Sequence, residues 1–480
     1  MGLSVCFQGG CNTYPTQTER PQPVRQRKAA LRARVNGNLA LRFSAAGLTS
    51  YSGLEVFRMF LQQIDFSARL RKHLRGQDPA GDFSSIGLVR LLIALVIVGG
   101  RRIRHLQYLA GDPLILRFAG LAVLPSARTV GRWLSRCSRT VRQALLRLSG
   151  ELVADCIRPL KLDRLTIDID GSVCSTGLKA EWARRGYNPH HRKVPSYYPR
   201  TAYCAQTGHI VRVKNCPGNI PDGKDAVPFM REVVAQIRST LGKIALEFRL
   251  DGAFFRRDVL DWLESRAEYA IKVPFYHWVG LKAVIQQRKR WRWIGVDLQA
   301  FETHLWLEPW KRRQRIVVYR KKVQHRSPKN YQLDLFDPSN GHWEYSAIAT
   351  NKTLGMRELW LFMAGRGAHE KALAELKTGL AFNTIPSLSY AANSVWQILV
   401  VLAHNLLTNF QIATRATRRR RTRKATAIFD LKSIRSLRYE LFNRAGLLQH
   451  PAGRATLTLS NNIPTRKLFE SIVDKLAQAA

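Results

Sequence analysis

Acidic residues are scarce in this chain of 480 residues, with 34 aspartates and glutamates against 77 lysines and arginines. The formal net charge at pH 7 is therefore +43, and the excess of cations is spread along the whole chain. Such a balance favours a polyanionic partner, usually nucleic acid, although a generically basic, ribosome-like protein has the same composition. Because carboxylates are so few, those in special sequence contexts are informative.

Paired cysteines and long apolar runs are also missing. The seven cysteines form no CxxC pair and no Cys/His ligand spacing, which argues against a structural zinc site and a disulfide framework and fits a reducing cytoplasm. The longest apolar run, Leu91–Val98, is well short of the roughly 20 residues that cross a membrane, so we expect a buried core helix there. No secretory signal is evident, and no membrane partner is expected.

The residues from 48 to 157 show helical periodicity, and one part of them suggests contact with a duplex. Asp112-Pro113 predicts a short helix that ends near Gly120, and Ser126 caps the next helix after a tight connection. This next helix is expected to carry four arginines on one face, at steps of four, four and three residues: Arg128, Arg132, Arg136 and Arg139. A helix-turn-helix with a basic stripe suits duplex DNA, while a solvated face of an ordinary bundle fits the same spacing.

From about Arg164 the pattern changes to alternating strands and helices. We assign strands to 165–170, 200–206, 209–215, 244–250 and 268–273, and helices to 224–241 and 256–266. Three antiparallel strands followed by β-α-β crossovers predict an α/β fold, with a mixed sheet that carries helices on both faces.

Residues 275–350 break this alternation and are rich in tryptophan and cations. Strand-like patches such as RIVVY and WEYSAIAT indicate a β-rich insertion. Aromatic side chains interleaved with cations suit stacking on unpaired bases, although packing in a β core explains any single tryptophan equally well. The run 414–427 is nearly pure cation and is either a phosphate clamp or an exposed linker.

Two of the predicted strands end in carboxylates. Asp168 and Asp170 lie at the end of strand 165–170, and Asp251 directly follows strand 244–250. These strands are expected to be neighbours, and ligand sites in open α/β sheets form at such carboxyl ends. We therefore predict two carboxylates side by side: Asp251 and one of the two aspartates of the first strand.

A third carboxylate, Glu370, lies in the helix predicted for RGAHEKALAELKTGL. Arg366, Glu370 and Lys377 are separated by four and seven residues, which places them within about 40° on one helical face. A surface ion-pair ladder would give the same Arg–Glu spacing. The strand-rich insertion before this helix favours a helix packed against the sheet near the aspartates.

Three carboxylates at one sheet edge suit phosphodiester cleavage. That reaction needs an activated nucleophile and a stabilised leaving oxyanion, and two divalent ions roughly 3.5–4 Å apart supply both. Mg²⁺ prefers oxygen ligands and keeps several waters, so a few carboxylates suffice, and Mn²⁺ is expected to substitute. Arg366 and Lys377 are then expected to hold the phosphates of the cut DNA end.

The sequence resembles the DDE transposases of bacterial insertion sequences, particularly the group-one DDE domain with a β insertion before the glutamate. The resemblance implies an RNase H-like catalytic core, two Mg²⁺ ions, and Asp170, Asp251 and Glu370 as catalytic metal ligands. It also implies cut-and-paste movement of an element with terminal inverted repeats. Double-stranded DNA at the element ends and target is then the partner, bound by a homodimer. The motifs behind it are LTIDIDGS (165–172), GYNPHHRKVPSYYP (186–199), VRVKNCPGN (211–219), RLDGAFFRRD (249–258) and RGAHEKALAELK (366–377).

The glutamate helix carries most of the family's signature, which is Tyr, two residues, Arg, three residues, Glu, six residues, Lys. Arg366, Glu370 and Lys377 fit this spacing, whereas Met363 stands at the tyrosine position and lacks the hydroxyl for that phosphate contact. Asp170, followed by Gly171 and then a serine, is the preferred first aspartate, and Asp168 is its alternative.

The motif 186–199 contains two adjacent histidines, His190 and His191. Adjacent side chains point in different directions and no partner lies at ligand spacing, so metal binding is not predicted. The segment is expected to be a basic, aromatic surface loop that grips DNA, or a structural turn at Asn188-Pro189.

Together these patterns divide the chain into six predicted segments and leave three functions open. A transposase would cut element ends and transfer the new 3′-OH into target DNA. A nuclease or resolvase of the same fold would cut without joining, and a non-catalytic protein would only bind DNA. The segments are a disordered basic N-terminus (1–40), a helical DNA-binding region (41–160), the first part of an RNase H-like core (161–274), a β-rich insertion (275–350), the second part of the core (351–413) and a basic C-terminal region (414–480).

Overall fold

The computed structural model describes five stretches of the chain: residues 46–79, 81–186, 193–323, 343–419 and 426–478. The expected disordered segment 1–40, the histidines His190 and His191, and the centre of the basic run 414–427 lie outside the described residues. All the structural features below belong to the unit that begins at Gly47.

The first part of this unit is helical, as its periodicity predicts. Leu91–Val98 lies in a helix whose side chains are almost all buried, so the expectation of a core helix is confirmed. Asp112 accepts hydrogen bonds from the backbone N–H groups of Leu114 and Ile115, and Ser126 accepts one from Thr129, so both predicted helix starts are present. The elements are β1 (Leu48–Thr49), α2 (Gly53–Gln63), α3 (Phe66–Leu74), α4 (Ser85–Ile97), η1 (Ile103–Leu109), α5 (Pro113–Ala119), α6 (Ala127–Arg136) and α7 (Arg139–Ile157).

The basic stripe of the predicted helix-turn-helix is divided between two helices, so its expected extent is wrong. Helix α6 ends at Arg136, and Ser138 caps a new helix by accepting a hydrogen bond from Val141. Arg139 is therefore the first residue of α7, because a serine in extended backbone starts a helix more readily than it continues one. All four arginines are exposed.

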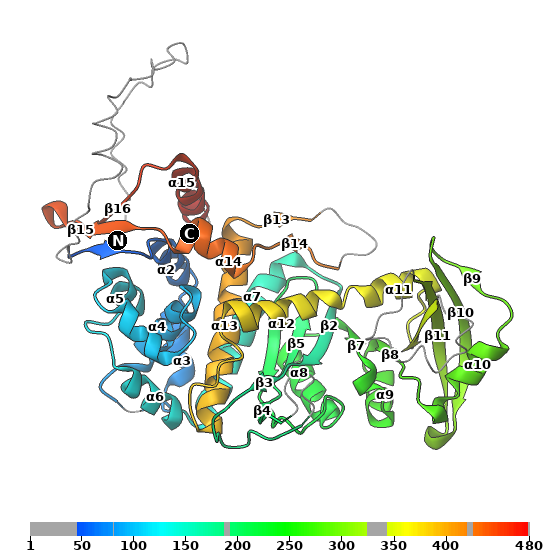
Figure 1. Cartoon of the computed structure of the whole chain (residues 1–480). Helices are drawn as coiled ribbons and strands as arrows, with labels where there is room; N and C mark the ends of the chain where they lie inside the picture. The colour runs from blue at the N-terminus through cyan, green and yellow to red at the C-terminus, as the bar shows by residue number, and fades with distance from the viewer. Residues whose placement is uncertain (1–45, 80, 187–192, 324–342, 420–425, 479–480) are drawn as a thin grey trace, which may run out of the picture. The chain divides into compact units, whose positions relative to one another are not determined.

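Within the described residues, nine strands form one mixed sheet, the main sheet (Figure 1). Strand β2 runs parallel to β7, and β7 runs parallel to β8, whereas the other neighbours are antiparallel. The predicted neighbourhood of the first and fourth strands and the RNase H-like α/β class are thereby confirmed. In spatial order the strands are β6 (Ile210–Lys214), β5 (Arg200–Cys204), β2 (Arg164–Gly171), β7 (Ala245–Leu250), β8 (Glu268–Lys272), β12 (Trp343–Thr350), β11 (Arg312–Lys322), β10 (Leu298–Leu307) and β9 (Arg292–Trp293).

The two faces of the main sheet are covered by different helices. Leucine, isoleucine and phenylalanine side chains on one face of β2 and β7 pack with α8 (Ala226–Leu241) and α9 (Arg257–Glu264). On the opposite face lie α11 (Met356–Ala364), whose Leu359 packs on the insertion strands, and α12 (Gly367–Gly379). Because successive side chains of a strand alternate between faces, the polar residues between the apolar ones point toward α11 and α12.

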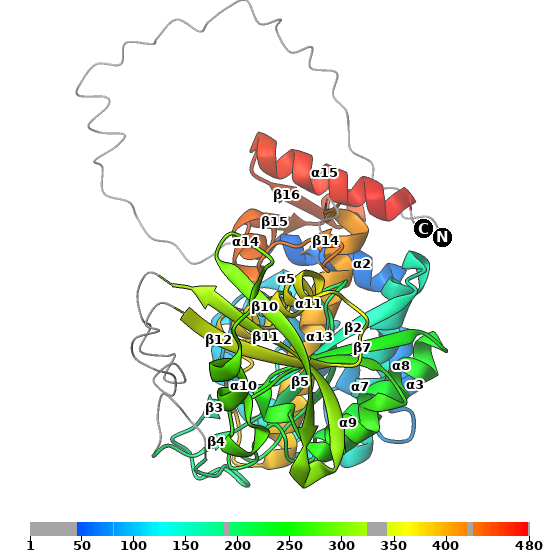
Figure 2. The same ribbon diagram turned by 90° about the vertical axis from the view of Figure 1, so that its right-hand side faces the viewer.

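The β-rich insertion is present, and its strands continue the main sheet. Strand β12 pairs with β8, and β11, β10 and β9 follow in order. Figure 2 shows β10, β11 and β12 near α10 (Leu281–Gln287). The tryptophans of the insertion differ in exposure, and stacking on bases stays a prediction. Trp291 packs on Phe301 and under Arg320, as a core residue does, whereas Trp293 and Trp306 are more than half exposed.

Helix α13 (Tyr390–Thr414) packs against α7, α4 and the edge strand β6 (Figure 1). Among the described helices it alone is long and apolar enough to cross a membrane by length and composition, and 89% of its apolar window is buried inside the protein. Polar side chains of α13 form hydrogen bonds with the edge of the main sheet. The Asn405 amide accepts a hydrogen bond from Ile210 N and donates to Ile210 O, at 2.9 and 2.8 Å, so it partners β6 where a further strand would otherwise pair.

Three small sheets lie outside the main sheet in the described residues. A short β13 (Thr417–Arg418) pairs with β14 (Phe429–Asp430), and β1 pairs with β15, which pairs with β16. The described cysteines are all free thiols. The other elements are β3 (Cys174–Ser175), β4 (Ser196–Tyr197), α14 (Ile434–Leu437), β15 (Gly446–Gln449), β16 (Thr456–Leu459) and α15 (Ile463–Gln478).

Replacement of Asn405 by leucine is expected to destabilise the protein. The substitution leaves the N–H and C=O of Ile210 buried without partners, at about 1–3 kcal/mol for each group. The midpoint of urea unfolding measures the loss, with the exposed Asn461→Leu as the matched control. Equal stability of the two variants would contradict the role assigned to Asn405.

Candidate active site

A ladder of polar pairs runs along the α12-facing side of strands β2 and β7. Thr166 is opposite Glu247 and Asp168 is opposite Arg249 in the parallel register. Two residues further on, Asp170 at the end of β2 and Asp251 after β7 continue the ladder as a like-charged pair. The first two pairs satisfy each other, because Thr166 donates a hydrogen bond to Glu247 and Arg249 donates to Asp168.

Asp168 and Asp170 share a strand face but differ in their partners. Both carboxylate oxygens of Asp168 accept hydrogen bonds from Arg249, at 2.6 and 2.7 Å, and both side chains are fully buried. A fully buried carboxylate whose charge is already balanced by a bidentate guanidinium is a poor position for a metal ion. Asp170 lies at the strand end with 16% of its side chain exposed, which favours it as the first ligand of the two.

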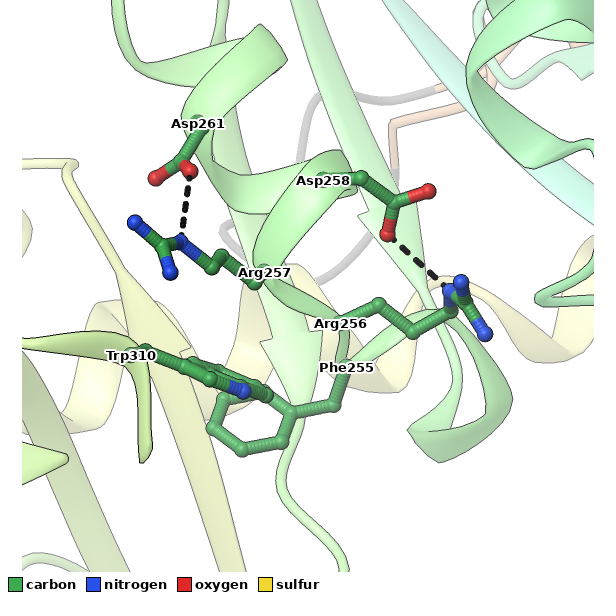
Figure 3. A pocket seen from close by; sticks show the side chains of 6 residues that line it. All are labelled: Phe255, Arg256, Arg257, Asp258, Asp261 and Trp310. Atoms are coloured by element: carbon green, nitrogen blue, oxygen red, sulfur yellow. Dashed lines mark hydrogen bonds and ion pairs between the residues drawn. The ribbon is translucent and has the colours of Figure 1, made fainter. Parts of the chain in front are cut away.

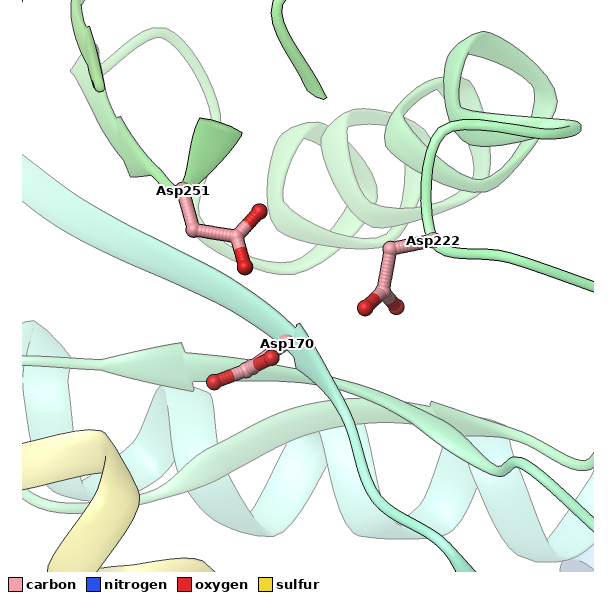
Figure 4. A group of neighbouring side chains, drawn as sticks. All are labelled: Asp170, Asp222 and Asp251. Carbon is pink, nitrogen blue, oxygen red and sulfur yellow. The ribbon is translucent and has the colours of Figure 1, made fainter. Parts of the chain in front are cut away.

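Asp222 joins Asp170 and Asp251, and the sequence analysis did not select it. One oxygen of each of these three carboxylates lies within 4.8 Å of the others, and Figure 4 shows the three groups pointing toward one another. Asp222 belongs to the segment between β6 and α8. The Tyr198 hydroxyl donates a 2.7 Å hydrogen bond to Asp222 Oδ2.

Arg366 is the cation closest to this cluster. Its Nη2 lies 2.8 Å from Asp170 and 3.8 Å from Asp251, and its Nη1 lies 3.3 Å from Glu370. Burial lowers the pKa of Arg366, but the carboxylates outweigh this effect and raise it. Arg366 therefore balances the charge of the cluster here, while its predicted contact with DNA phosphate stays a prediction.

Two carboxylates of the cluster, those of Asp170 and Asp222, have a raised pKa. Burial raises the pKa of Asp170 to about 7; Asp222 and Asp251 act in the same direction and Arg366 opposes them. Burial, followed by the charge of Asp251, raises the pKa of Asp222 to about 6 against the hydrogen bond from Tyr198. A site that disfavours its own negative charge is suited to a divalent cation.

Glu370 lies beside the three aspartates and outside their 4.8 Å cluster. It is in the first turn of α12, with 63% of its side chain exposed, and its recorded partner is Arg366. Arg366 precedes the first residue of the helix, where it occupies the cap position. The structure thus brings the predicted Arg366 and Glu370 to the aspartates, and it links Glu370 to them through the guanidinium.

His369 fixes the start of α12 on the main sheet. Its imidazole is fully buried, stacks on Tyr203 at 5.1 Å, and lies 2.9 Å from the Thr201 hydroxyl through Nε2. Thr201 is the strand partner of Asp170. Burial, aided by two nearby arginines, lowers the pKa of His369 to about 3, so the ring is neutral. The residue next to Glu370 therefore connects the helix to β5, the strand that pairs with the strand of Asp170.

The two signature positions furthest from Glu370, Lys377 and Met363, are less closely connected to the carboxylate cluster. Lys377 is half-buried two turns beyond Glu370, close enough to Cys174 for its charge to oppose the rise in that thiol's pKa. Met363, at the tyrosine position, packs with the apolar cluster around Leu359. The expected aromatic surface at the end of motif 186–199 is wrong, because Tyr197 is buried and Tyr198 turns inward to Asp222.

A shallow hollow follows Asp251 along the chain. It has a volume of about 630 Å³, and Trp310 packs on Phe255 at 4.9 Å at its base. Both of its arginines are already paired, one with Asp258 at 3.0 Å and one with Asp261 at 3.4 Å (Figure 3). It is separate from the carboxylate cluster. Its lining residues are Phe255, Arg256, Arg257, Asp258, Asp261 and Trp310.

The fold and the cluster define an α/β enzyme of the RNase H-like class with a candidate divalent-metal centre at the carboxyl ends of its parallel strands. Three carboxylates supply the hard oxygen ligands that Mg²⁺ and Mn²⁺ prefer, so the residues present fit such an ion. The family described as transposase DDE domain group 1 matches residues 32–480. The chain therefore belongs to this family of metal-dependent, DNA-cutting transposases.

The similarity to individual known proteins is weaker than the similarity to this family. None of the curated proteins matches the chain. Among solved structures it is similar to a piggyBac transposase in a synaptic complex with hairpin DNA, at 11% sequence identity and a TM-score of 0.42. That similarity covers 91% of this chain and 88% of the other.

Asp168→Asn and Asp170→Asn are expected to change stability in opposite ways at pH 8 in EDTA. The first leaves the Arg249 charge buried without its partner, which costs about 3–5 kcal/mol. The second removes a carboxylate whose pKa rises from 3.8 to about 7 on folding. The folded state binds this proton more tightly, so ionisation between these values lowers stability, and the penalty is complete at pH 8.

Thermal unfolding of both variants beside the wild type measures this difference. Asp168→Asn should melt well below the wild type, and Asp170→Asn at or above it. A comparable loss in both variants would contradict the separate roles of the two aspartates.

Proposed function

We propose that the protein cuts the ends of an insertion sequence and transfers the new 3′-OH ends into target DNA. The observation that carries this proposal is the like-charged end of the ladder, where Asp170 and Asp251 meet at the carboxyl ends of two parallel strands. Elsewhere along this ladder each charge has its own partner, whereas at this end two carboxylates share the single guanidinium of Arg366, so a further cation would complete the balance of charge. Mg²⁺, with Mn²⁺ as a substitute, is the cofactor we propose.

Each residue of the site has a distinct part in this chemistry. Bound as a pair, divalent ions activate the attacking oxygen and stabilise the leaving oxyanion of a phosphodiester. Asp170 and Asp251 hold the cations, and Glu370, at the open side of the cluster, completes their ligands. Arg366 links Glu370 to both aspartates and keeps the carboxylates oriented, while His369 holds the helix against β5.

The substrate is double-stranded DNA, at the element ends and at the target. The exposed arginines of α6, together with Arg139 at the start of α7, support a phosphate-binding surface in the helical region. Lys377 lies two turns beyond Glu370 on α12, where we propose that it contacts the phosphates of the cut DNA end. Joining two ends requires both to be held at once, so we propose a homodimer on DNA, acting in a bacterial cytoplasm.

Asp251→Asn and Glu370→Gln are expected to abolish cleavage of an end oligonucleotide with Mg²⁺ or Mn²⁺. A loss of about 100-fold or more is expected, since even outer partners of metal ligands cost 10–100-fold. Asp258→Asn, an exposed acid paired with Arg256, is the matched control and should cut normally. Cleavage that survives in either site variant would overturn that residue's assignment, and cutting without any joining to target DNA would leave a nuclease.

Arg128→Ala and Arg132→Ala are each expected to weaken DNA binding irrespective of sequence. Loss of one phosphate contact lowers the slope of log K against log salt by about 1. Fluorescence anisotropy over a salt series gives this slope. Lys243→Ala is the control, because Lys243 precedes β7 at the sheet edge opposite the carboxylates. An unchanged slope in both arginine variants would identify the stripe as an ordinary solvated face.

A further inference from the structure

We propose that Asp222 is a third aspartate ligand of the metal centre, contributed by the segment between β6 and α8. The inference rests on the proposed function, in which the cluster binds divalent cations, and it extends the ligand set beyond Asp170, Asp251 and Glu370. One carboxylate oxygen of Asp222 lies within 4.8 Å of an oxygen of Asp170 and of an oxygen of Asp251, and Glu370 is outside this group.

The Asp222 side chain is oriented as a ligand would be. The residue is 5% exposed, and its Oδ1 is buried and accepts no hydrogen bond. Arg200 Nε forms a long ion pair with Oδ1 at 3.8 Å, beyond hydrogen-bond distance. In Figure 4 the carboxylate points toward Asp170 and Asp251. A buried carboxylate oxygen without a donor costs free energy, so its retention beside two other carboxylates indicates a cation.

The segment that carries Asp222 is held rigidly in place. The fully buried Arg200 donates hydrogen bonds to three of its backbone carbonyls, at Pro221, Lys224 and Asp225, over 2.8–3.3 Å. These bonds fix the backbone on both sides of Asp222. Arg200 itself extends from β5, the neighbour of β2, so the segment is anchored to the same sheet as Asp170.

Two glycines let the segment approach the cluster. A Cβ on Gly171 would lie 2.0 Å from the Tyr198 ring and 2.5 Å from Asp222 Oδ1. A Cβ on Gly223 would lie 2.3 Å from the carbonyl oxygen of Ala253, in the turn that follows Asp251. Any side chain at either glycine would therefore push Asp222 away from one of the other two aspartates.

An alternative role for Asp222 is purely structural, as the acceptor for the Tyr198 hydroxyl. That role uses Oδ2 alone. It explains neither the absence of a hydrogen bond to Oδ1 nor the orientation of the group toward two other carboxylates. It also makes a different prediction, since Asp222→Asn keeps an amide oxygen that accepts the same hydrogen bond.

Titration of the full-length, metal-free protein with Mn²⁺ alone tests the proposal, with free Mn²⁺ followed by its EPR signal. Asp222→Asn should weaken Mn²⁺ binding by about tenfold or more, as expected for a ligand. Tyr198→Phe, which removes the hydrogen bond and keeps the carboxylate, and the exposed Asp258→Asn should bind as the wild type does. In EDTA, Asp222→Asn should melt at or above the wild-type temperature.

The outcomes separate this inference from the proposed function. Wild-type Mn²⁺ affinity in Asp222→Asn, together with lost affinity in Asp170→Asn, would overturn the role of Asp222 and leave the metal centre intact. Unchanged affinity in both variants would overturn the metal centre as well. An equal loss in Tyr198→Phe, or a lower melting temperature of Asp222→Asn in EDTA, would make Asp222 a structural acceptor and overturn the proposal.

Discussion

The buried ion pair between Asp168 and Arg249 is the interaction on which the rest of the site depends. Burial of either charge alone is strongly unfavourable, and the two charges are opposite each other in the observed parallel register of β2 and β7. That register brings Asp170 and Asp251 to the same sheet edge. Arg249 also donates a 2.9 Å hydrogen bond to the carbonyl of Phe362, near the end of α11, so the same guanidinium locates the helix pair that delivers Arg366 and Glu370.

Because acidic residues are scarce in this chain, their clustering at one site is notable. The chain places three of its few carboxylates within one cluster, against their mutual repulsion, and surrounds them with cations. Arg366 lies inside the cluster and Arg200 lies behind it. Both are held by hydrogen bonds or ion pairs to fixed groups, so they can balance charge without closing the open side where Glu370 is exposed. Positive charge elsewhere on the surface remains available for a polyanion.

Much of this arrangement was predictable from sequence because it follows from local rules. Alternation predicted the strands, short polar side chains predicted the caps at Asp112 and Ser126, and strand ends predicted the meeting of Asp170 with Asp251. Asp222 was not predictable, because Pro-Asp-Gly between a strand and a helix has the composition of an ordinary turn. The partner that distinguishes Asp168 from Asp170, Arg249, is 81 residues away in sequence, so only the strand register identifies it. The cap at Ser138 was a local signal that the arginine spacing obscured.

The insertion strands have a mechanical consequence. They are hydrogen-bonded to β8 through β12, in an unbroken ladder that reaches the strands of Asp170 and Asp251. An added domain joined by a hinge can swing without disturbing its host, but a shared sheet transmits twist and bending along its whole width. A molecule that binds and bends β10 or β11 would therefore also strain the backbone at Asp251, because the strands of one sheet move together. Excising the insertion would also leave β8 as a newly exposed, unpaired edge, open to pairing with another chain.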